Sequence, residues 1–98
     1  MKPTASERRH MERIASIPCL VCGARSTVHH VTAGIHGGRV SRRHDRTVPL
    51  CPRHHQIQHG PRESVEALGH GGFYREYGID LMDEAERLWI ESSRRYAA

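Results

Sequence analysis

The chain has 98 residues, of which 37% are hydrophobic and five are aromatic, so it has room for one domain with a thin core. Its net charge is +4, and 14 of its 15 basic residues are arginine. That excess favours a polyanionic partner such as nucleic acid, although genomic base composition also raises arginine content. No apolar run approaches the roughly 18 residues of a membrane span, and the first residues lack the apolar core of a signal peptide, so we expect a cytoplasmic protein with no membrane partner.

The N-terminal half of the chain predicts one helix followed by two strands with a long connection. Thr4 and Glu7 have the spacing of a capping box, and the apolar positions behind them predict a helix over residues 5–16. Residues 26–31 and 47–50 are rich in β-favouring side chains and predict the strands. The stretch between them is too long for a tight turn, and long loops in small domains are usually functional.

The C-terminal half predicts helices. A short helix begins at Pro52 and is expected to continue to Gly60. Helical turns are predicted over 62–68 and 71–77, with Gly78 as a C-cap. A final helix follows an Asp80 N-cap, and its core-facing stripe consists of Leu81, Ala85, Leu88 and Trp89.

Two pairs of candidate metal ligands share one spacing. Cys19-x-x-Cys22 precedes the first predicted strand, and Cys51-x-x-His54 follows the second. An odd number of cysteines placed beside histidines favours metal over disulfides, and two such turns are how structural zinc is held. We therefore expect a closed tetrahedral zinc site. The alternative is a buried strand-end cysteine with a surface histidine.

Four further histidines suggest a second site. His55 and His59 are four residues apart on the predicted helix, so they share one face. His29 and His30 are adjacent on a predicted strand and point to opposite faces, so one can bind a metal while the other acts as a base. The alternatives are a second structural zinc site or ordinary surface histidines.

The Cys/His arrangement over residues 19–59 resembles the HNH, or ββα-metal, endonuclease superfamily. It is most similar to phage and prophage recombination-enhancement nucleases with a Pro-Leu-Cys-x-x-His-His-x-x-x-His core. The resemblance implies an α+β fold with a small zinc-stapled ββα-metal core and flanking N-terminal and C-terminal helices. It implies a single nuclease domain over 1–98, with the core at 19–60 and a C-terminal helical extension at 61–98.

The same resemblance implies an enzyme that hydrolyses DNA phosphodiester bonds. By position, His30 corresponds to the general base, and the ligands of one catalytic divalent ion, Mg²⁺ or Mn²⁺, correspond to His29, His55 and His59. The base would take a proton from water that attacks phosphorus, while the ion neutralises charge on the phosphate. An imidazole suits this role because its ordinary pKa is about 6.5.

One residue of the family pattern is missing. The chain contains no asparagine, the residue that in the family braces the loop behind the catalytic histidine. Asp45 is our candidate replacement, because a carboxylate can accept the same backbone hydrogen bonds and hold an imidazole tautomer. His44 is the less favoured substitute. If neither braces the loop, the protein would bind DNA without cutting it.

The connection between the strands is basic. Residues 37–46 contain Arg39, Arg42, Arg43 and Arg46 beside glycines that allow the backbone to approach a duplex. We interpret them as phosphate contacts that make DNA binding non-specific or shape-selective. The alternative is a solvated charged surface.

Three functions fit these patterns. The first is the endonuclease, either as a monomer or as a homodimer. The second is a non-catalytic zinc-finger-like DNA-binding module. The third is a zinc-stapled adaptor that uses the C-terminal helix to bind phage or host recombination and replication proteins.

Overall fold

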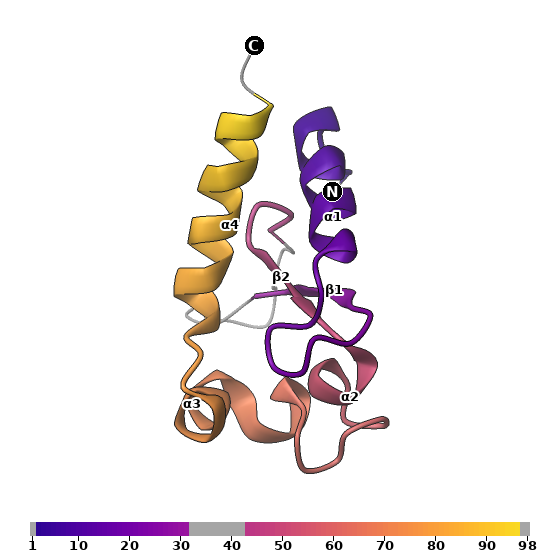
Figure 1. The fold of residues 1–98 in the computed structure, drawn as a ribbon, viewed down its shortest axis with the longest axis vertical. Coiled ribbons are helices and arrows are strands. Elements are labelled where there is room, and N and C mark those ends of the chain that lie inside the picture. The colour runs from indigo at the N-terminus through magenta and orange to yellow at the C-terminus, as the bar shows by residue number, and fades with distance from the viewer. Residues whose placement is uncertain (1, 32–42, 97–98) are drawn as a thin grey trace.

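An antiparallel pair of strands lies at the centre of the computed structural model, which describes residues 2–31 and 43–96 (Figure 1). In chain order the elements are α1 (Ala5–Ser16), β1 (Thr27–His30), β2 (Thr47–Leu50), α2 (Pro52–His55), α3 (Val65–Tyr77) and α4 (Leu81–Arg95). In Figure 1, α1 and α4 stand side by side above the sheet, and α2 and α3 lie below it. The predicted α+β class is confirmed.

Local sequence sets the ends of several elements. The predicted first helix is confirmed at both ends, and it begins with a capping box in which Thr4 N donates to Glu7 Oε1 (2.8 Å) and Glu7 N donates to Thr4 Oγ1 (3.1 Å). The final helix begins after Asp80, whose carboxylate accepts a hydrogen bond from Asp83 N (3.1 Å). The second strand is confirmed as predicted, and the first is one residue shorter at each end.

The predicted helix from Pro52 to Gly60 is wrong in its second half. α2 ends at His55, because Gln56 has an extended backbone (φ −111°, ψ 136°) and the chain folds back on α2. A Cβ atom at Gly60 would lie 1.8 Å from the carbonyl oxygen of Arg53, so only glycine permits this close approach. His59 therefore lies in the turn after α2, and the shared helix face expected for it does not form.

The two helical pieces predicted over 62–68 and 71–77 form one broken helix, whose first piece begins at Val65, three residues later than predicted. Gly69 interrupts α3 with φ 73° and ψ 167°, a conformation that is open essentially to glycine alone. Gly78 ends α3 in the left-handed region (φ 70°), as the predicted C-cap requires.

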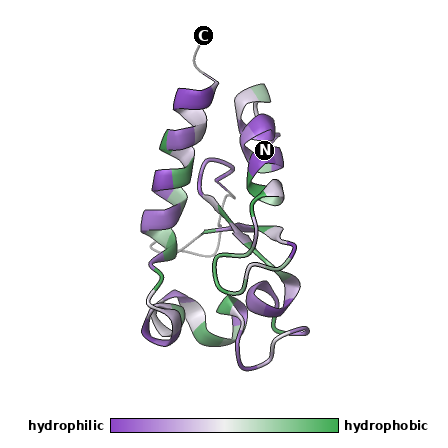
Figure 2. Cartoon of the chain, in the orientation of Figure 1, coloured by the Kyte–Doolittle hydropathy of each residue, from purple (hydrophilic) through white to green (hydrophobic). Residues whose placement is uncertain are grey.

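The core lies between the sheet and the helices around it. In Figure 2 the apolar colour gathers on the strands and at the C-terminal end of α1, while much of α1 and α4 is polar. The predicted stripe of α4 is buried at Leu81, Ala85 and Leu88. The other buried hydrophobic side chains are Ile14, Cys19, Val31, Val48, Leu50, Cys51, Val65 and Phe73.

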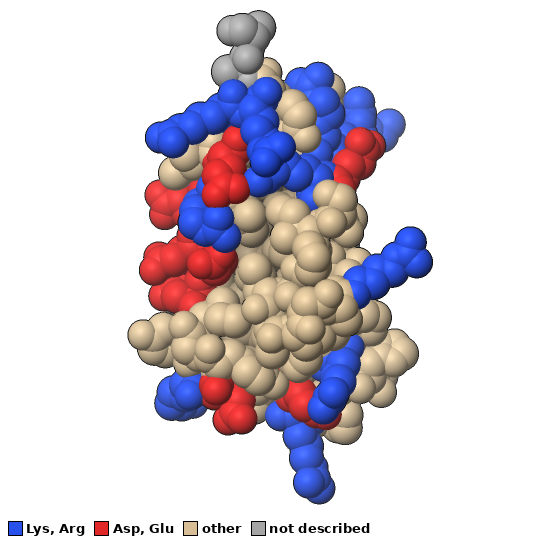
Figure 3. All heavy atoms as spheres, in the orientation of Figure 1, with Lys and Arg blue, Asp and Glu red and all other residues tan. Residues whose placement is uncertain are grey.

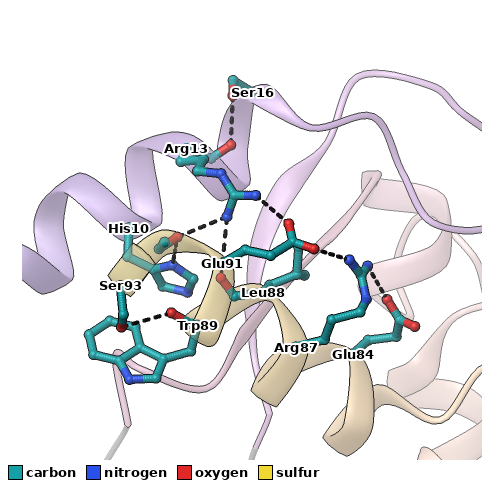
Figure 4. A network of polar contacts seen from close by, with 10 residues as sticks. His10, Arg13, Ser16, Glu84, Arg87, Leu88, Trp89, Glu91 and Ser93 are labelled. Atoms are coloured by element: carbon teal, nitrogen blue, oxygen red, sulfur yellow. Dashed lines mark hydrogen bonds and ion pairs between the residues drawn. The ribbon is translucent and has the colours of Figure 1, made fainter. Parts of the chain in front are cut away.

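Polar contacts reinforce the pairing of α1 with α4 (Figure 4). The side chain of Arg13 is only 11% exposed, and it donates to the Leu88 carbonyl (3.2 Å), to Ser92 Oγ (2.8 Å) and to Glu91 Oε1 (2.7 Å). His10 is fully buried, with Nδ1 2.6 Å from Ser92 Oγ. Burial, and then the charge of Arg13, lower the pKa of His10 to about 4, so its imidazole is neutral at physiological pH.

We expect Arg13→Ala to lower the free energy of unfolding by about 1–3 kcal/mol, because the Leu88 carbonyl and the Ser92 hydroxyl lose a half-buried charged donor. Arg87→Ala is the matched control, since Arg87 pairs with the same Glu91 from an exposed position and should cost clearly less. Urea denaturation of both variants measures the difference. Equal losses would contradict the buried role of Arg13.

Candidate metal centres and active site

Four side chains from two turns converge beside the sheet. The ligand atoms of Cys19, Cys22, Cys51 and His54 all lie within 4.8 Å of one another. Cys22 Sγ is 3.7 Å from Cys51 Sγ, and His54 Nδ1 is 3.2 Å from Cys51 Sγ and 3.8 Å from Cys19 Sγ. These are the four residues that the sequence pairs by spacing.

The geometry of this Cys₃His group fits zinc. A sulfur–sulfur distance of 3.7 Å is far longer than a disulfide bond, and all three cysteines are free. It matches the edge of a tetrahedron built with zinc–sulfur bonds of about 2.3 Å. Three sulfurs and one imidazole nitrogen are a donor set of structural zinc, so the group could hold such an ion.

Backbone hydrogen bonds shape the first turn of the Cys₃His group. Gly23 has φ +76°, which lets the chain reverse so that Gly23 N donates to the Cys19 carbonyl (2.9 Å). Leu20 N donates to the Pro49 carbonyl of β2 (3.2 Å), and this bond ties the turn to the sheet. Burial raises the pKa of the Cys19 thiol, but backbone N–H groups, including that of Val21 (3.4 Å), lower it more and favour the thiolate.

A second histidine group lies on the other side of α2. Side chains alternate along β1, so His29 shares a face with Thr27. The ring of His29 lies 4.8 Å from that of His55 between centroids, and its Nε2 is 3.3 Å from Nε2 of His70 in α3. His70 was not among the predicted ligands, because its Gly-His-Gly-Gly surroundings carry no ligand spacing.

Thr27 fixes the tautomer of His55. The Thr27 hydroxyl has one proton, which it donates to the Leu50 carbonyl (2.7 Å). Its contact with His55 Nδ1 (2.8 Å) must therefore be one that it accepts, so His55 carries its proton on Nδ1. The neutral ring then presents the lone pair of Nε2, and a hydrogen bond to the other ring nitrogen is what usually orients a metal-binding histidine.

The histidines of this group are held neutral. Burial is the main reason that the pKa of His29 falls to about 3. Repulsion from the imidazoles of His55, His70 and His30, when these are protonated, lowers it further. Burial also lowers the pKa of His55 and of His70. A neutral imidazole is the form that binds a metal ion.

His59 lies apart from these contacts. Its backbone N–H donates to the Gln56 carbonyl (3.1 Å), and its Nε2 is 3.3 Å from Nε2 of Gln58. Within residues 2–31 and 43–96, the Cys₃His group alone brings three or more metal-ligand atoms within 4.8 Å of one another. The catalytic metal site formed by His29, His55 and His59 stays a prediction.

The candidate base, His30, meets His44. Nε2 of His30 is 3.1 Å from Nδ1 of His44, with the rings nearly perpendicular. The carboxylate of Asp45 instead receives two bonds from Arg43 (3.2 and 3.0 Å) and one from Arg46 (3.4 Å). These arginines hold the pKa of Asp45 below its usual value, although burial opposes them. The bracing role expected for Asp45 stays a prediction, and His44 contacts the candidate base.

The four arginines expected to contact DNA are only partly described. Arg39 and Arg42 lie outside the described residues. Arg43 and Arg46 flank Asp45, with side chains 54% and 24% exposed. Elsewhere, Figure 3 shows basic side chains gathered over the upper ends of α1 and α4, where Arg8, Arg9, Arg94 and Arg95 are exposed.

Comparisons with known proteins identify one family. Residues 3–71 match the model of the family described as recombination enhancement, RecA-dependent nuclease. The matched range contains α1, both strands, α2, the Cys₃His group and His70. No curated protein matches the chain. Among the described residues, no helix is long and apolar enough to cross a membrane.

We expect a strong zinc chelator, or the substitution Cys51→Ser, to abolish the cooperative thermal transition of the protein. The reason is that binding energy at a structural zinc site is also folding energy, on the order of 10 kcal/mol. Circular dichroism melting and native mass spectrometry measure stability and zinc content together. His59→Ala, outside the group, serves as the control. A folded, zinc-free Cys51→Ser protein with an unchanged melting temperature would contradict a structural role.

Proposed function

The chain belongs to the recombination-enhancement, RecA-dependent nuclease family, and from this premise we propose that it is a metal-dependent endonuclease of the HNH type. Its substrate is DNA, and its reaction is the hydrolysis of phosphodiester bonds. The observation that carries the proposal is the arrangement at the end of β1, where His30 meets His44 and His29 meets His55 and His70.

In the proposed reaction His30 is the general base. Its imidazole takes a proton from a water molecule, the water oxygen forms a bond to phosphorus, and the bond from phosphorus to the leaving oxygen breaks. The leaving oxygen takes a proton from solvent. His44 is a positioning residue that orients the ring of His30 through the 3.1 Å contact.

The metal ligands in this proposal are His29, His55 and His59. These residues would hold a divalent ion, Mg²⁺ or Mn²⁺, which would supply positive charge beside the phosphate and the leaving oxygen. Support comes from the neutral state of His29 and from the tautomer of His55, which leaves Nε2 available. His59 follows α2 in a turn, from which its side chain must reach the other two.

The partners follow from charge and from the family. Exposed arginines beside Asp45 and over α1 and α4 suit contacts with phosphates, which are independent of base sequence. The family description further suggests that cutting depends on RecA.

A non-catalytic zinc-finger-like DNA-binding module is the second candidate. The end of α2 at His55 favours it, because His55 and His59 then lack the shared helix face expected of a ligand pair. The two candidates share zinc and DNA binding, and they differ only in whether the DNA is cut.

We expect the zinc-loaded protein to nick DNA with Mg²⁺ or Mn²⁺, and His30→Ala to cut about 10²–10⁴-fold more slowly, because a general base contributes that much. Gel assays with supercoiled plasmid and with RecA-coated single strands measure the rate. Arg75→Ala, an exposed change on α3, is the control. Wild-type rates in His30→Ala would refute the base. Binding without cutting on both substrates would favour the binding module.

Thr27→Val tests how His55 is held. Valine keeps the shape and the strand propensity of threonine but cannot accept the hydrogen bond from Nδ1–H of His55. We expect the affinity for the catalytic ion to fall about 10- to 100-fold, because loss of a residue that hydrogen-bonds to a metal ligand usually has this effect. Calorimetric titration of zinc-loaded protein with Mn²⁺ measures the affinity. Unchanged affinity with an intact fold would show that the hydroxyl does not orient a ligand.

A further inference from the structure

His70 occupies a specific place in the fold. It is the first residue after the break in α3, and it follows Gly69, whose backbone conformation (φ 73°, ψ 167°) is open essentially to glycine alone. A continuous helix would direct residue 70 differently relative to residues 65–68. Glycine adopts this conformation without strain, so Gly69 allows α3 to break directly before His70.

The distance between His29 and His70 suits a shared ion. Their Nε2 atoms lie 3.3 Å apart, and the rings are tilted by 30° with centroids 5.5 Å apart. Two imidazole nitrogens bound to one ion at about 2.0–2.1 Å lie roughly 3.0–3.4 Å from each other. The simpler explanation is a single hydrogen bond between two neutral rings, which gives the same distance.

The chemistry around this pair is dominated by imidazole. The ring of His55 also packs against that of His29. Its Nε2 lone pair is available because Nδ1–H of His55 donates to the Thr27 hydroxyl. The nearby carboxylates are Glu66, which acts on His55, and Asp80, which acts on His70, both through charge alone. Imidazole binds zinc-like transition ions well, whereas Mg²⁺ prefers oxygen ligands.

We propose that His70 is a ligand of the second metal ion, together with His29, and that this imidazole-rich site binds Co²⁺ or Zn²⁺ more tightly than Mg²⁺. The assignment rests on the proposed function only for the location of the ion. It adds a ligand from α3 to a site whose expected ligands come from β1 and from the segment that begins with α2. The broken helix then has a purpose, since Gly69 aims His70 at β1.

The test titrates Co²⁺ into the full chain already loaded with one equivalent of zinc, with calorimetry for affinity and visible absorption for coordination. Wild type, His70→Ala, His70→Glu and the control Arg75→Ala are compared. We expect His70→Ala to weaken Co²⁺ binding at least about tenfold, since loss of a direct ligand lowers affinity no less than loss of a residue that hydrogen-bonds to a ligand. His70→Glu should restore most of the affinity, because its carboxylate reaches about as far as Nε2. Arg75→Ala should match wild type.

Several results would overturn the assignment. One is wild-type Co²⁺ affinity in His70→Ala. Another is an equal loss of affinity in the Ala and Glu variants, which would indicate that His70 acts through packing alone. A third is the lack of a second bound ion in the wild-type protein. Melting curves of the zinc-loaded variants identify any that fail to fold. DNA cutting is scored separately. Cutting by wild type with unchanged metal binding in His70→Ala defeats this assignment alone, whereas His70-dependent binding without cutting defeats the proposed function alone.

Discussion

Three sulfurs and one imidazole nitrogen converge from the two sides of the β-hairpin, where one zinc ion could join them. Cys19 and Cys22 precede β1, whereas Cys51 and His54 follow β2, so this group connects segments that the short sheet alone holds weakly. The strands have four residues each, and the chain has only five aromatic side chains to fill a core. A core this small usually needs a further crosslink, and the Cys₃His group lies where a crosslink has the greatest effect.

The short helix α2 links this structural group to the histidines of the candidate active site. His54 and His55 are neighbours on a helix, so their side chains point about 100° apart. One ring therefore faces the cysteines while the other faces β1. The Thr27 hydroxyl joins the two strands and also fixes the tautomer of His55, so the register of the sheet decides which nitrogen of that ring is available.

The last helix supports the site from outside the matched range. α4 begins ten residues after the family match ends at residue 71, yet it buries Leu81, Ala85 and Leu88 against the rest of the core. Its contacts with Arg13 attach it to α1, which packs on both strands. The start of α4 also borders the second histidine group, since His70 lines one pocket together with Asp80 and Leu81.

The sequence alone determined the features that depend on neighbouring residues. Local hydrogen bonding or ligand spacing determines the ends of α1, the extent of β2, the C-cap of α3, the N-cap of α4 and the four members of the Cys₃His group, and each was predicted. The resemblance to recombination-enhancement nucleases, which rests on a motif of contiguous residues, was likewise confirmed.

Tertiary contacts decided the rest of the candidate site. α2 stops before His59, because the chain must fold back closely enough to place Gly60 on the carbonyl of Arg53. His70 reaches His29 across 41 residues of sequence, and no spacing rule connects a histidine in a broken helix with one in a strand. The contact of His44 with His30 and the bonds of Asp45 to Arg43 have the same origin, since His44 and Asp45 are neighbours in sequence and only the path of the backbone determines what each side chain meets.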